Sequence, residues 1–487
     1  MYSDVENASV DVAIIGGGCS GTLTAVQLVD QYVLAQLSTP LSIVIIDDSP
    51  LPARGVAYGT GCSEHLLNVS AKGMSGLARD GAHFARWLKH RLPESVPESF
   101  APRMYYGDYL SELLEQSRMA ASGAVRLDVI KNLAVSIEIL DGRPRIKLDS
   151  GQTLDAAQVV LALGNFPPES SYFAALIDPS LQDRFHDNPW QDKVFQAISS
   201  DDEILLIGTG LTMIDAVLQL RANGHTGLVH AISRHGYLPQ PHLDLERLAA
   251  EKPTSYLPAS MPSHLGSVLR LVRRATRAAE LDSPGNWRCV MHELRQVTAS
   301  IWQQMTNEDR SRFLRHVRQL WEVHRHRMAP EIALQIKELV DAGVLHVSAG
   351  RVVQFGPAAG AIAVSIMPRG SSTALRIFAN HVINCTGPKT DFRTVGDPLI
   401  QKLRSSGILQ ADELGLGARV DLDGALLNHS GQRSDCMYAM ASLRKGLLWE
   451  TTAVPEIRQQ ASDMAALLLR KLCPEHEQRS ATAATGI

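Results

Sequence analysis

The sequence predicts an α/β fold with two parallel sheets and a helical insertion, and three observations carry this prediction. A strand, a glycine-rich turn and a helix occur near the start of the chain and again near its middle. Two later strands, in residues 159–168 and 382–388, each end in Gly close to Pro. Residues 240–345 carry apolar positions at three- and four-residue intervals, which is the pattern of amphipathic helices.

Length and composition indicate a globular chain of two or three domains. The 487 residues exceed what one simple core holds, and 45% hydrophobic with 20% charged residues argue against extensive disorder. The net charge of -4 gives no indication of nucleic acid or an anionic membrane as partner. No apolar run approaches the roughly 20 residues that cross a bilayer. The first residues, MYSDVENAS, lack the cationic and apolar parts of a secretory signal, so we expect a cytoplasmic protein.

The first glycine-rich turn lies in residues 13–23, which read AIIGGGCSGTL. A strand, Gly-x-Gly-x-x-Gly and a helix form a pattern that holds a pyrophosphate. In this pattern Gly16 permits the tight turn, Gly18 lets the backbone approach the phosphates, and Gly21 allows close packing of helix and strand. Together with Ser20 at the start of the helix, these glycines are the expected phosphate-binding turn.

The elements around this turn complete a βαβ unit. We expect a strand over residues 10–15, a helix over 21–36 and a second strand over 41–46. Asp47 stands where the second strand ends, and an acid there accepts hydrogen bonds from an adenosine ribose, with Asp48 as the second candidate. Because the whole context is present, a dinucleotide site is favoured over a glycine-rich turn without a ligand.

A second copy of the pattern, EILLIGTGLTMIDA, starts at Glu203. Again a buried strand leads into Gly-x-Gly and an apolar helix, but Met213 replaces the third glycine. By itself this copy leaves open an ordinary strand-to-helix turn. The residues expected to hold phosphates here are Gly208, Gly210, Leu211 and Thr212.

The strand after this second copy indicates which nucleotide it holds. Residues 227–232 form the strand, which ends in Ser233 and Arg234 rather than in an acid. An acid favours NAD, whereas Ser and Arg hold a 2′-phosphate. We therefore expect FAD in the first unit, which comes first and has the acid, and NADPH in the second.

The two strands that end in Gly near Pro mark where the chain crosses between the two units. This places a discontinuous FAD-binding domain at residues 1–165 and 385–487, and an NADPH-binding domain at residues 166–384. The helical insertion at about 240–345, with a break at Ser-Pro-Gly 283–285, belongs to the second domain. We expect it to cover a substrate pocket or to form a contact in a homo-oligomer.

The cysteines argue against disulfide reduction. Enzymes of that kind need a close pair of redox-active thiols, and no two of these cysteines have CxxC spacing. The same scatter leaves structural zinc unsupported, so no metal site is expected. The six cysteines are Cys19, Cys62, Cys289, Cys385, Cys436 and Cys473.

Five stretches, spread over nearly the whole chain, carry a family resemblance. They read GGGCSG, GVAY followed by HLLNV, GTGLTMID, HRHRMAP and GLLWETTAVPEIR. In this order they resemble the two-dinucleotide-binding flavoproteins that include flavin-dependent monooxygenases, and more closely the YdhS-like bacterial FAD/NAD(P)-binding family. The resemblance implies two Rossmann-like domains and chemistry similar to NAD(P)H-using hydroxylases, including urate hydroxylation and N-hydroxylation of amino groups.

The resemblance also implies contacts to the flavin ring. In this class the segment that holds Asn68 and Met74 runs under the ring, where Asn68 would bond a flavin edge and Met74 would pack on its face. An ordinary loop anchored by Asn is the alternative. Arg54 is a candidate to lie over the adenine or the phosphates, with a surface salt bridge as the other interpretation.

The C-terminal helix of this class points its N-terminus at the flavin pyrimidine. That implies a role for the backbone amides of Thr452, Ala453 and Val454, with a plain helix cap as the alternative. One departure is visible, since Ala441-Ser-Leu stands where the family has Gly-Pro-Leu, so the contact to the ring is expected to differ. His324-Arg-His-Arg327 suits an anion or a solvated helix face better than a metal.

The function expected from these features is an FAD-dependent, NADPH-using monooxygenase. It would hydroxylate a small molecule with O₂ through a C4a-hydroperoxyflavin, at an amine or amino acid nitrogen or at a ring carbon. One alternative is an NAD(P)H:acceptor oxidoreductase without oxygenation. A further alternative is a flavin-bound regulatory protein with the helical insertion as its binding surface.

Overall fold

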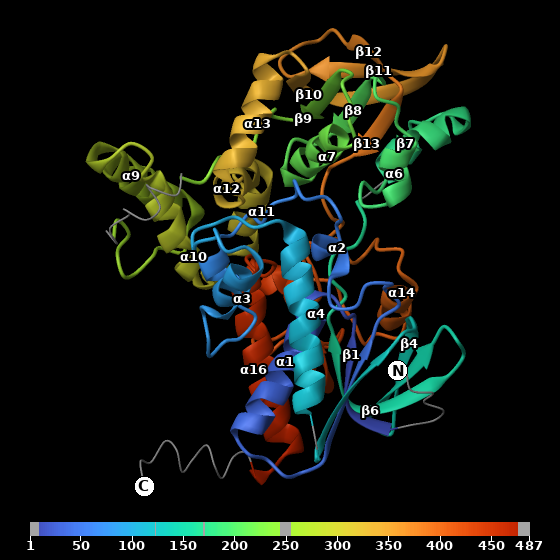
Figure 1. Ribbon diagram of the computed structural model, residues 1–487, viewed down its shortest axis with the longest axis vertical. Helices are drawn as coiled ribbons and strands as arrows, with labels where there is room; N and C mark the ends of the chain where they lie inside the picture. Colours follow the sequence, from blue (N-terminus) through green and yellow to red (C-terminus); the bar gives the residue numbers. More distant parts are fainter. Residues whose placement is uncertain (1–8, 122, 169–170, 244–254, 476–487) are drawn as a thin grey trace.

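The computed structural model describes residues 9–121, 123–168, 171–243 and 255–475. Two sheets, one above the other in Figure 1, form the centres of two units, and a group of helices lies beside them. Within the described ranges, no helix is both long and apolar enough to cross a membrane.

The first sheet has the strand order β14-β15-β6-β1-β2-β3, and the hairpin β4–β5 joins it beside β6. All neighbours from β15 to β3 are parallel, while β14 and the hairpin are antiparallel to their partners. The bounds are β1 Ser9–Ile15, β2 Leu41–Ile46, β3 Val125–Ile130, β4 Ala134–Leu140, β5 Arg143–Leu148, β6 Thr153–Leu161, β14 Ala425–Leu427 and β15 Arg433–Ala439.

Three long helices cover one face of this sheet and lie alongside one another in Figure 1: α1 Cys19–Leu34, α4 Arg103–Ala120 and α16 Val454–Leu472. The apolar hairpin residues and α14 (Pro398–Ser405) close the other face. The shorter helices of this unit are α2 Gly55–Tyr58, η1 Ala71–Gly73, α3 His83–Arg91, η3 Ala441–Arg444 and α15 Lys445–Leu448.

The second sheet has the order β12-β11-β10-β9-β8-β13-β7 and is parallel from β10 to β7. Helices α7 (Leu211–Ala222) and α13 (Pro330–Asp341) pack their apolar sides on one face of it. Its strands are β7 Phe185–His186, β8 Ile204–Ile207, β9 Val229–Ser233, β10 Leu345–Ala358, β11 Ala361–Pro368, β12 Leu375–Ala379 and β13 His381–Asn384; α5 Ser171–Ala174, η2 Pro179–Arg184 and α6 Asp192–Gln196 precede β8.

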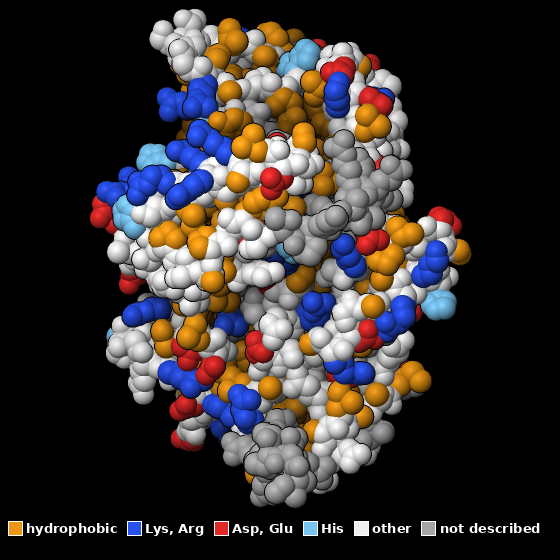
Figure 2. All heavy atoms as spheres, turned by 90° about the vertical axis from the view of Figure 1, so that its left-hand side faces the viewer, with side chains coloured by type: hydrophobic (Ala, Val, Ile, Leu, Met, Phe, Trp, Pro, Cys, Tyr) orange, Lys and Arg blue, Asp and Glu red, His pale blue; other side chains and the backbone are white. Residues whose placement is uncertain are grey.

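The expected helical insertion is present between β9 and β10. It contains α9 Leu265–Asp282, α10 Trp287–Gln304, α11 Asn307–His316 and α12 Arg318–Arg325, and Ser283–Gly285 separates α9 from α10. Residues 244–254 of the expected range lie outside the described residues. Figure 2 faces the side of the molecule on which the insertion lies and shows Lys and Arg side chains gathered there. Exposed arginines of α9 at helical spacing are Arg270, Arg273, Arg274 and Arg277.

The insertion packs against the returning part of the first unit. Its apolar core includes Leu416 and Trp449 from that part of the chain. The indole of Trp302 donates to the carbonyl of Gly446 at 2.8 Å. The chain thus leaves the first sheet after β6, builds the second sheet and the insertion, and returns to the first sheet with β14 and β15. The α/β class with two nucleotide-fold units and an insertion is confirmed, and the exact domain boundaries stay a prediction.

The two glycine-rich turns have the same backbone conformation at their first glycine. Gly16 has φ +100° and Gly208 has φ +119°. A side chain at Gly16 would press on the carbonyl of Ala162 after β6, and one at Gly208 on the carbonyl of Cys385 after β13. Both turns therefore need glycine, because each passes directly over the neighbouring parallel strand.

Candidate functional site

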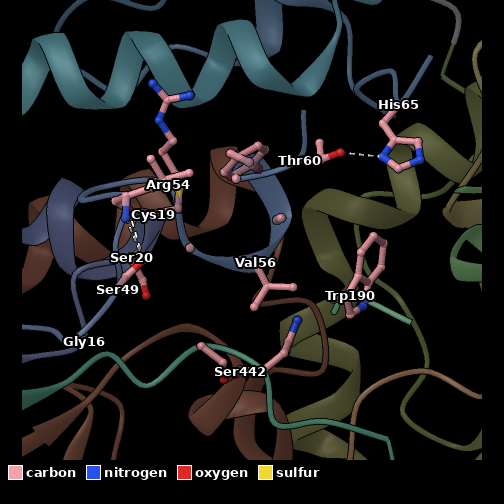
Figure 3. A pocket seen from close by; sticks show the side chains of 18 of the residues that line it. Gly16, Cys19, Ser20, Ser49, Arg54, Val56, Thr60, His65, Trp190 and Ser442 are labelled. Atoms are coloured by element: carbon pink, nitrogen blue, oxygen red, sulfur yellow. Dashed lines mark hydrogen bonds between the residues drawn. The ribbon is translucent and has the colours of Figure 1, made fainter. Parts of the chain in front are cut away.

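A cavity of about 550 Å³ opens at the carboxyl end of β1 (Figure 3). β1 lies between β2 and β6, and ligands of parallel α/β sheets bind at such a change of direction in the strand order. The wall combines the first glycine-rich turn, residues 47–51, residues 54–61 and residues 162–165. It also includes Thr212 and Asp215 of α7, so the second unit closes the cavity of the first.

Two helix N-termini point into this cavity wall. Cys19 and Ser20 begin α1 after the N-cap Gly18, and Thr452 precedes α16, whose N-cap is Ala453. Neither Gly nor Ala has a side chain that can accept from the free first-turn amides. These amides and the positive ends of both helices suit a ligand that is negatively charged at two places.

The first turn leaves room for a ligand at Gly18. A Cβ added there would meet its nearest protein atom, the Cα of Gly55, only at 3.5 Å. Gly16, Gly18 and Ser20 all line the cavity, while Gly21 lies behind them against the strand. The structure therefore brings together the residues expected to hold phosphates and gives Gly21 the expected packing position.

The two acids after β2 both line the cavity. The carboxylate of Asp47 accepts from the backbone amides of Gly17 and of Ser49, the latter at 2.7 Å. Asp47 therefore fixes the turn as well as facing the cavity, and Asp48 is exposed beside it. Contact with a ribose stays a prediction for both.

Arg54 lines the same end of the cavity, and its guanidinium donates to Asp108 of α4 at 2.6 Å. Of the two interpretations of Arg54, the structure thus shows the salt bridge. The Arg54 side chain still lines the cavity together with Asp47, where the adenosine is expected.

Cys19 is the cysteine that lines the cavity. Burial raises the pKa of the Cys19 thiol to about 12, and the neighbouring Tyr106 hydroxyl lowers it only in part. At neutral pH this group is a thiol and not the thiolate that attacks disulfides. All six cysteines are free of disulfide bonds.

The structure does not bring Asn68 and Met74 into the cavity. The carbonyl of Asn68 accepts from His242 Nε2 at 3.0 Å, and Met74 is 2% exposed within the core below α1 and α4. After His65 the chain turns into η1, where the amide of Ala71 donates to the carbonyl of Ser99 and holds the segment inside the first unit. Their contact to the flavin stays a prediction.

Other residues, which the sequence analysis did not propose as site residues, form the cavity wall on the side away from the first turn. Thr60, His65 and Trp190 line the cavity, and Figure 3 shows the imidazole and the indole on the side away from the first turn. His65 and Asp215 lie in two of the quoted family motifs, which is a signal that could have found them. Trp190 stands in a loop without any motif.

The second turn is open at its glycine. Nothing lies within 4 Å of a Cβ added at Gly210, which is the N-cap of α7 before Leu211 and Thr212. Ser233 shares a hydrogen bond with Thr209 at 2.8 Å and accepts from the amide of Gly236 at 3.0 Å. Ser233 thus ties the two loops at the ends of β8 and β9 together.

A basic cluster lies directly after β9. Arg234 is exposed, and His235 stacks on Tyr237 with ring centroids 5.3 Å apart. The guanidinium of Arg369, which follows β11, donates to His235 Nδ1 at 2.9 Å. Burial, then Arg369 and Arg234, lower the pKa of His235. The sequence missed Arg369, because only the pairing of β10 with β11 carries it to this point.

The turn after β15 is tight although it contains no glycine. Ala441 has φ +50°, a left-handed conformation that favours Gly, and its amide donates to Gln460 of α16 at 3.1 Å. The hydroxyl of Ser442 donates to the carbonyl of Gly164. Ala441 and Ser442 line the cavity, so the residues that depart from Gly-Pro-Leu face the site.

The histidine- and arginine-rich segment is paired with acids inside the protein through Arg325. Arg325 lies 3.3 Å from Glu450 and 3.7 Å from Glu456, and Trp321 donates to Glu450 at 2.9 Å. Its charge is therefore balanced by the segment that leads into α16. Arg327 faces the ring of Trp287 at 5.9 Å.

Comparison with known proteins agrees with this geometry. Residues 13–166 match a family model described as FAD-NAD(P)-binding. No curated protein matches the sequence. The chain is similar to L-lysine 6-monooxygenase from Pseudomonas syringae at 17% identity, with a TM-score of 0.65 over 95% of this chain and 99% of that chain.

Two further solved structures show the range of this fold. Ornithine N-hydroxylase from Kutzneria sp. 744, described as KtzI-FADred-NADP+-L-orn, has 13% identity and a TM-score of 0.61, covering 95% of this chain and 99% of that one. Bacillithiol disulfide reductase Bdr (YpdA) from Staphylococcus aureus has 13% identity and a TM-score of 0.56 over the same shares, 95% and 99%.

The chain therefore has the fold of two-dinucleotide-binding flavoproteins, and residues 13–166 form an FAD/NAD(P)-binding domain. This confirms the expected class and the expected pair of cofactors, FAD and a nicotinamide nucleotide. The fold is shared by monooxygenases and a reductase, so the reaction has to be argued from the site.

Proposed function

We propose that the protein is an FAD-dependent, NADPH-using monooxygenase that hydroxylates a small molecule. The observation that carries this proposal is the shared cavity, whose wall joins the first turn, the start of α16 and the side of α7. Both nucleotide units thus contribute to one site, where a nicotinamide can meet a flavin.

The first unit fits FAD. Gly16, Gly18 and the N-terminus of α1 would hold the pyrophosphate, and Asp47 would hold the adenosine ribose. The N-terminus of α16 at Thr452, which stays without a capping side chain, would face the ring edge that gains negative charge on reduction.

The second unit fits NADPH. The open turn at Gly210 and the start of α7 would hold its pyrophosphate, as the equivalent turn does in the first unit. Arg234 and Arg369 offer two guanidinium groups for a 2′-phosphate. The NADP+ in the description of the Kutzneria enzyme is consistent with this choice.

Bound flavin supplies the electron and oxygen chemistry of such enzymes. For an amine the balance is R–NH₂ + NADPH + H⁺ + O₂ giving R–NHOH + NADP⁺ + H₂O. The chain's own part is to orient the nucleotides and to exclude water, for which Val56, Trp190 and Ile457 provide apolar wall. The N-hydroxylating enzymes of the same fold support an amine or amino acid as substrate, and a ring carbon is the other target that we propose.

One observation separates this proposal from disulfide reduction. The cavity cysteine, Cys19, has a raised pKa and no disulfide, so no reactive thiol pair faces the site in the described residues. The likeness to the reductase fold keeps a simpler NAD(P)H:acceptor oxidoreductase, without a thiol in its reaction, as the second candidate.

Stopped-flow mixing of NADPH-reduced protein with oxygenated buffer tests the proposal. A lasting flavin spectrum that differs from the reduced and the oxidised forms supports oxygenation and directs substrate screening to amines, amino acids and purines. Direct return to oxidised flavin in the presence of each of these substrates, with NADPH use unchanged by them, contradicts oxygenation and supports the acceptor oxidoreductase.

A further inference from the structure

A buried ion pair joins the two units beside the cavity. Arg103, at the start of α4 in the first unit, donates from both terminal nitrogens to the carboxylate of Asp215 on α7, at 2.8 and 3.1 Å. The two side chains are 14% and 7% exposed. In this contact each charge compensates the other, and removing one partner would leave the remaining charge buried without compensation.

The same two residues hold the loop that forms the cavity wall. The carbonyl of Asp215 accepts from His65 Nε2 at 2.9 Å, which makes Nδ1 the acceptor for the hydroxyl of Thr60 at 2.8 Å. Arg103 Nε donates to the carbonyl of Leu66 at 3.1 Å. Burial is the largest effect on the pKa of His65 and lowers it, which keeps the ring neutral in this arrangement.

The position of Asp215 on α7 connects this network to the second turn. Asp215 lies one helical turn after Leu211 and Thr212, where the NADPH phosphates are expected. Thr60, His65 and Asp215 line the cavity together. The helix that would carry NADPH is therefore fixed, through one residue, to the loop that bounds the flavin cavity.

We propose that Asp215 is a positioning residue, which through Arg103 and His65 holds α7 against the first unit so that nicotinamide and flavin meet without rotation of one unit against the other. This inference rests on the proposed use of NADPH. In the step concerned, NADPH is oxidised to NADP⁺ and the bound flavin takes up its hydride. Asp215 itself transfers nothing.

Two measurements on the full-length FAD-loaded Asp215→Asn variant test the inference. The first is amide hydrogen exchange without NADPH, where we expect faster exchange in residues 60–66 and at the starts of α4 and α7. The second is anaerobic flavin reduction, where we expect reduction by NADPH to slow at least about tenfold and reduction by dithionite to stay unchanged. Asp155→Asn, which breaks the exposed Arg145–Asp155 pair within the first unit, is the matched control and should change neither.

Unchanged exchange in the variant, or faster exchange with wild-type reduction by NADPH, would overturn the inference. If Asp215→Asn does not fold, Thr60→Val removes the donor to His65, together with the acceptor for the amide of Cys62, and should give the same two changes at smaller size. Wild-type behaviour of Thr60→Val in both measurements would then overturn the inference. Failure of the proposed use of NADPH is distinguishable, because wild-type protein would then not be reduced by NADPH although its exchange pattern still reports the network.

Discussion

The two glycine-rich turns of this chain share their first two glycines and differ at the third position. In the first turn a side chain at Gly21 would collide with the carbonyl oxygen of Gly16. In the second, Met213 occupies the equivalent position and is fully buried in the core between α7 and its sheet. The third glycine is thus required by the close packing of α1 on its turn and not by phosphate binding. In the second unit, Met213 at this position packs into the apolar core beneath α7.

The largest effect on stability should come from adding a side chain at the third glycine of the first turn. Gly21→Ala places a methyl group against backbone that cannot move without shifting β1 or α1, so we expect about 3 kcal/mol of destabilisation and loss of FAD. Thermal unfolding and the flavin content of the purified protein measure this. Met213→Leu, a volume-conserving change at the equivalent position, should cost less than about 1.5 kcal/mol. Equal losses in the two variants would contradict the comparison.

The second glycines should separate binding from folding. Gly18→Ala adds a methyl group that no protein atom obstructs, so we expect unchanged unfolding of the apoprotein but no retained flavin, because the methyl would meet the pyrophosphate. Gly210→Ala should leave the flavin bound and weaken NADPH instead. Absorbance of bound flavin and NADPH titration check both variants, and a yellow Gly18→Ala protein would refute the assignment of FAD to the first turn.

The strand ends after the two turns differ as well, with Asp47 in the first unit and the cluster of Arg234, His235 and Arg369 in the second. Arg369→Ala removes one guanidinium from the expected 2′-phosphate site. We expect the KM for NADPH to rise about tenfold, which corresponds to ~1.4 kcal/mol, with the KM for NADH unchanged. Arg376→Ala, at an exposed arginine of the neighbouring strand β12, is the control; equal effects on NADPH and NADH would remove Arg369 from this role.

The smallest expected effect concerns pH. In the free protein the pKa of His235 is lowered by burial and by the two arginines, so the ring is neutral at neutral pH. A 2′-phosphate beside it would raise that pKa, so NADPH binding would take up a proton and strengthen as the pH falls, whereas NADH binding would not. The ratio of the two dissociation constants at pH 6 and pH 8 measures this. His235→Gln should flatten the part of the pH dependence that exceeds titration of the phosphate itself, and an unchanged slope would exclude His235.

The sequence was sufficient for the parts of the fold that are local. The expected strand over 41–46 has those bounds in the structure, and the helix expected over 21–36 is α1, Cys19–Leu34. These elements depend on short sequence patterns: turn glycines, alternation of strand and helix, and the proline near the start of α16. The same holds for the first glycine-rich turn, whose residues Gly16, Gly18 and Ser20 line the cavity together, while their contact with a phosphate stays a prediction.

The rest of the site depends on contacts between distant residues. Arg103 and Asp215 are separated by 112 residues in the sequence, and Arg369 and His235 by 134. No local sequence pattern therefore predicts either pair. Asn68 and Met74 lie outside the cavity, although they follow the first βαβ unit closely in sequence. A backbone hydrogen bond from Ala71 to Ser99 holds their segment inside the first unit, and their contact to the flavin stays a prediction.

The late return of the chain to the first sheet, with β14 and β15, has a consequence for synthesis. The second sheet is complete in sequence once β13 ends at residue 384, whereas β15, which lies beside β6 in the first sheet, ends at residue 439. During translation the second sheet can therefore form while the first sheet still lacks β15. The first unit is therefore the last to be finished on the ribosome, although its first residues are the first to emerge.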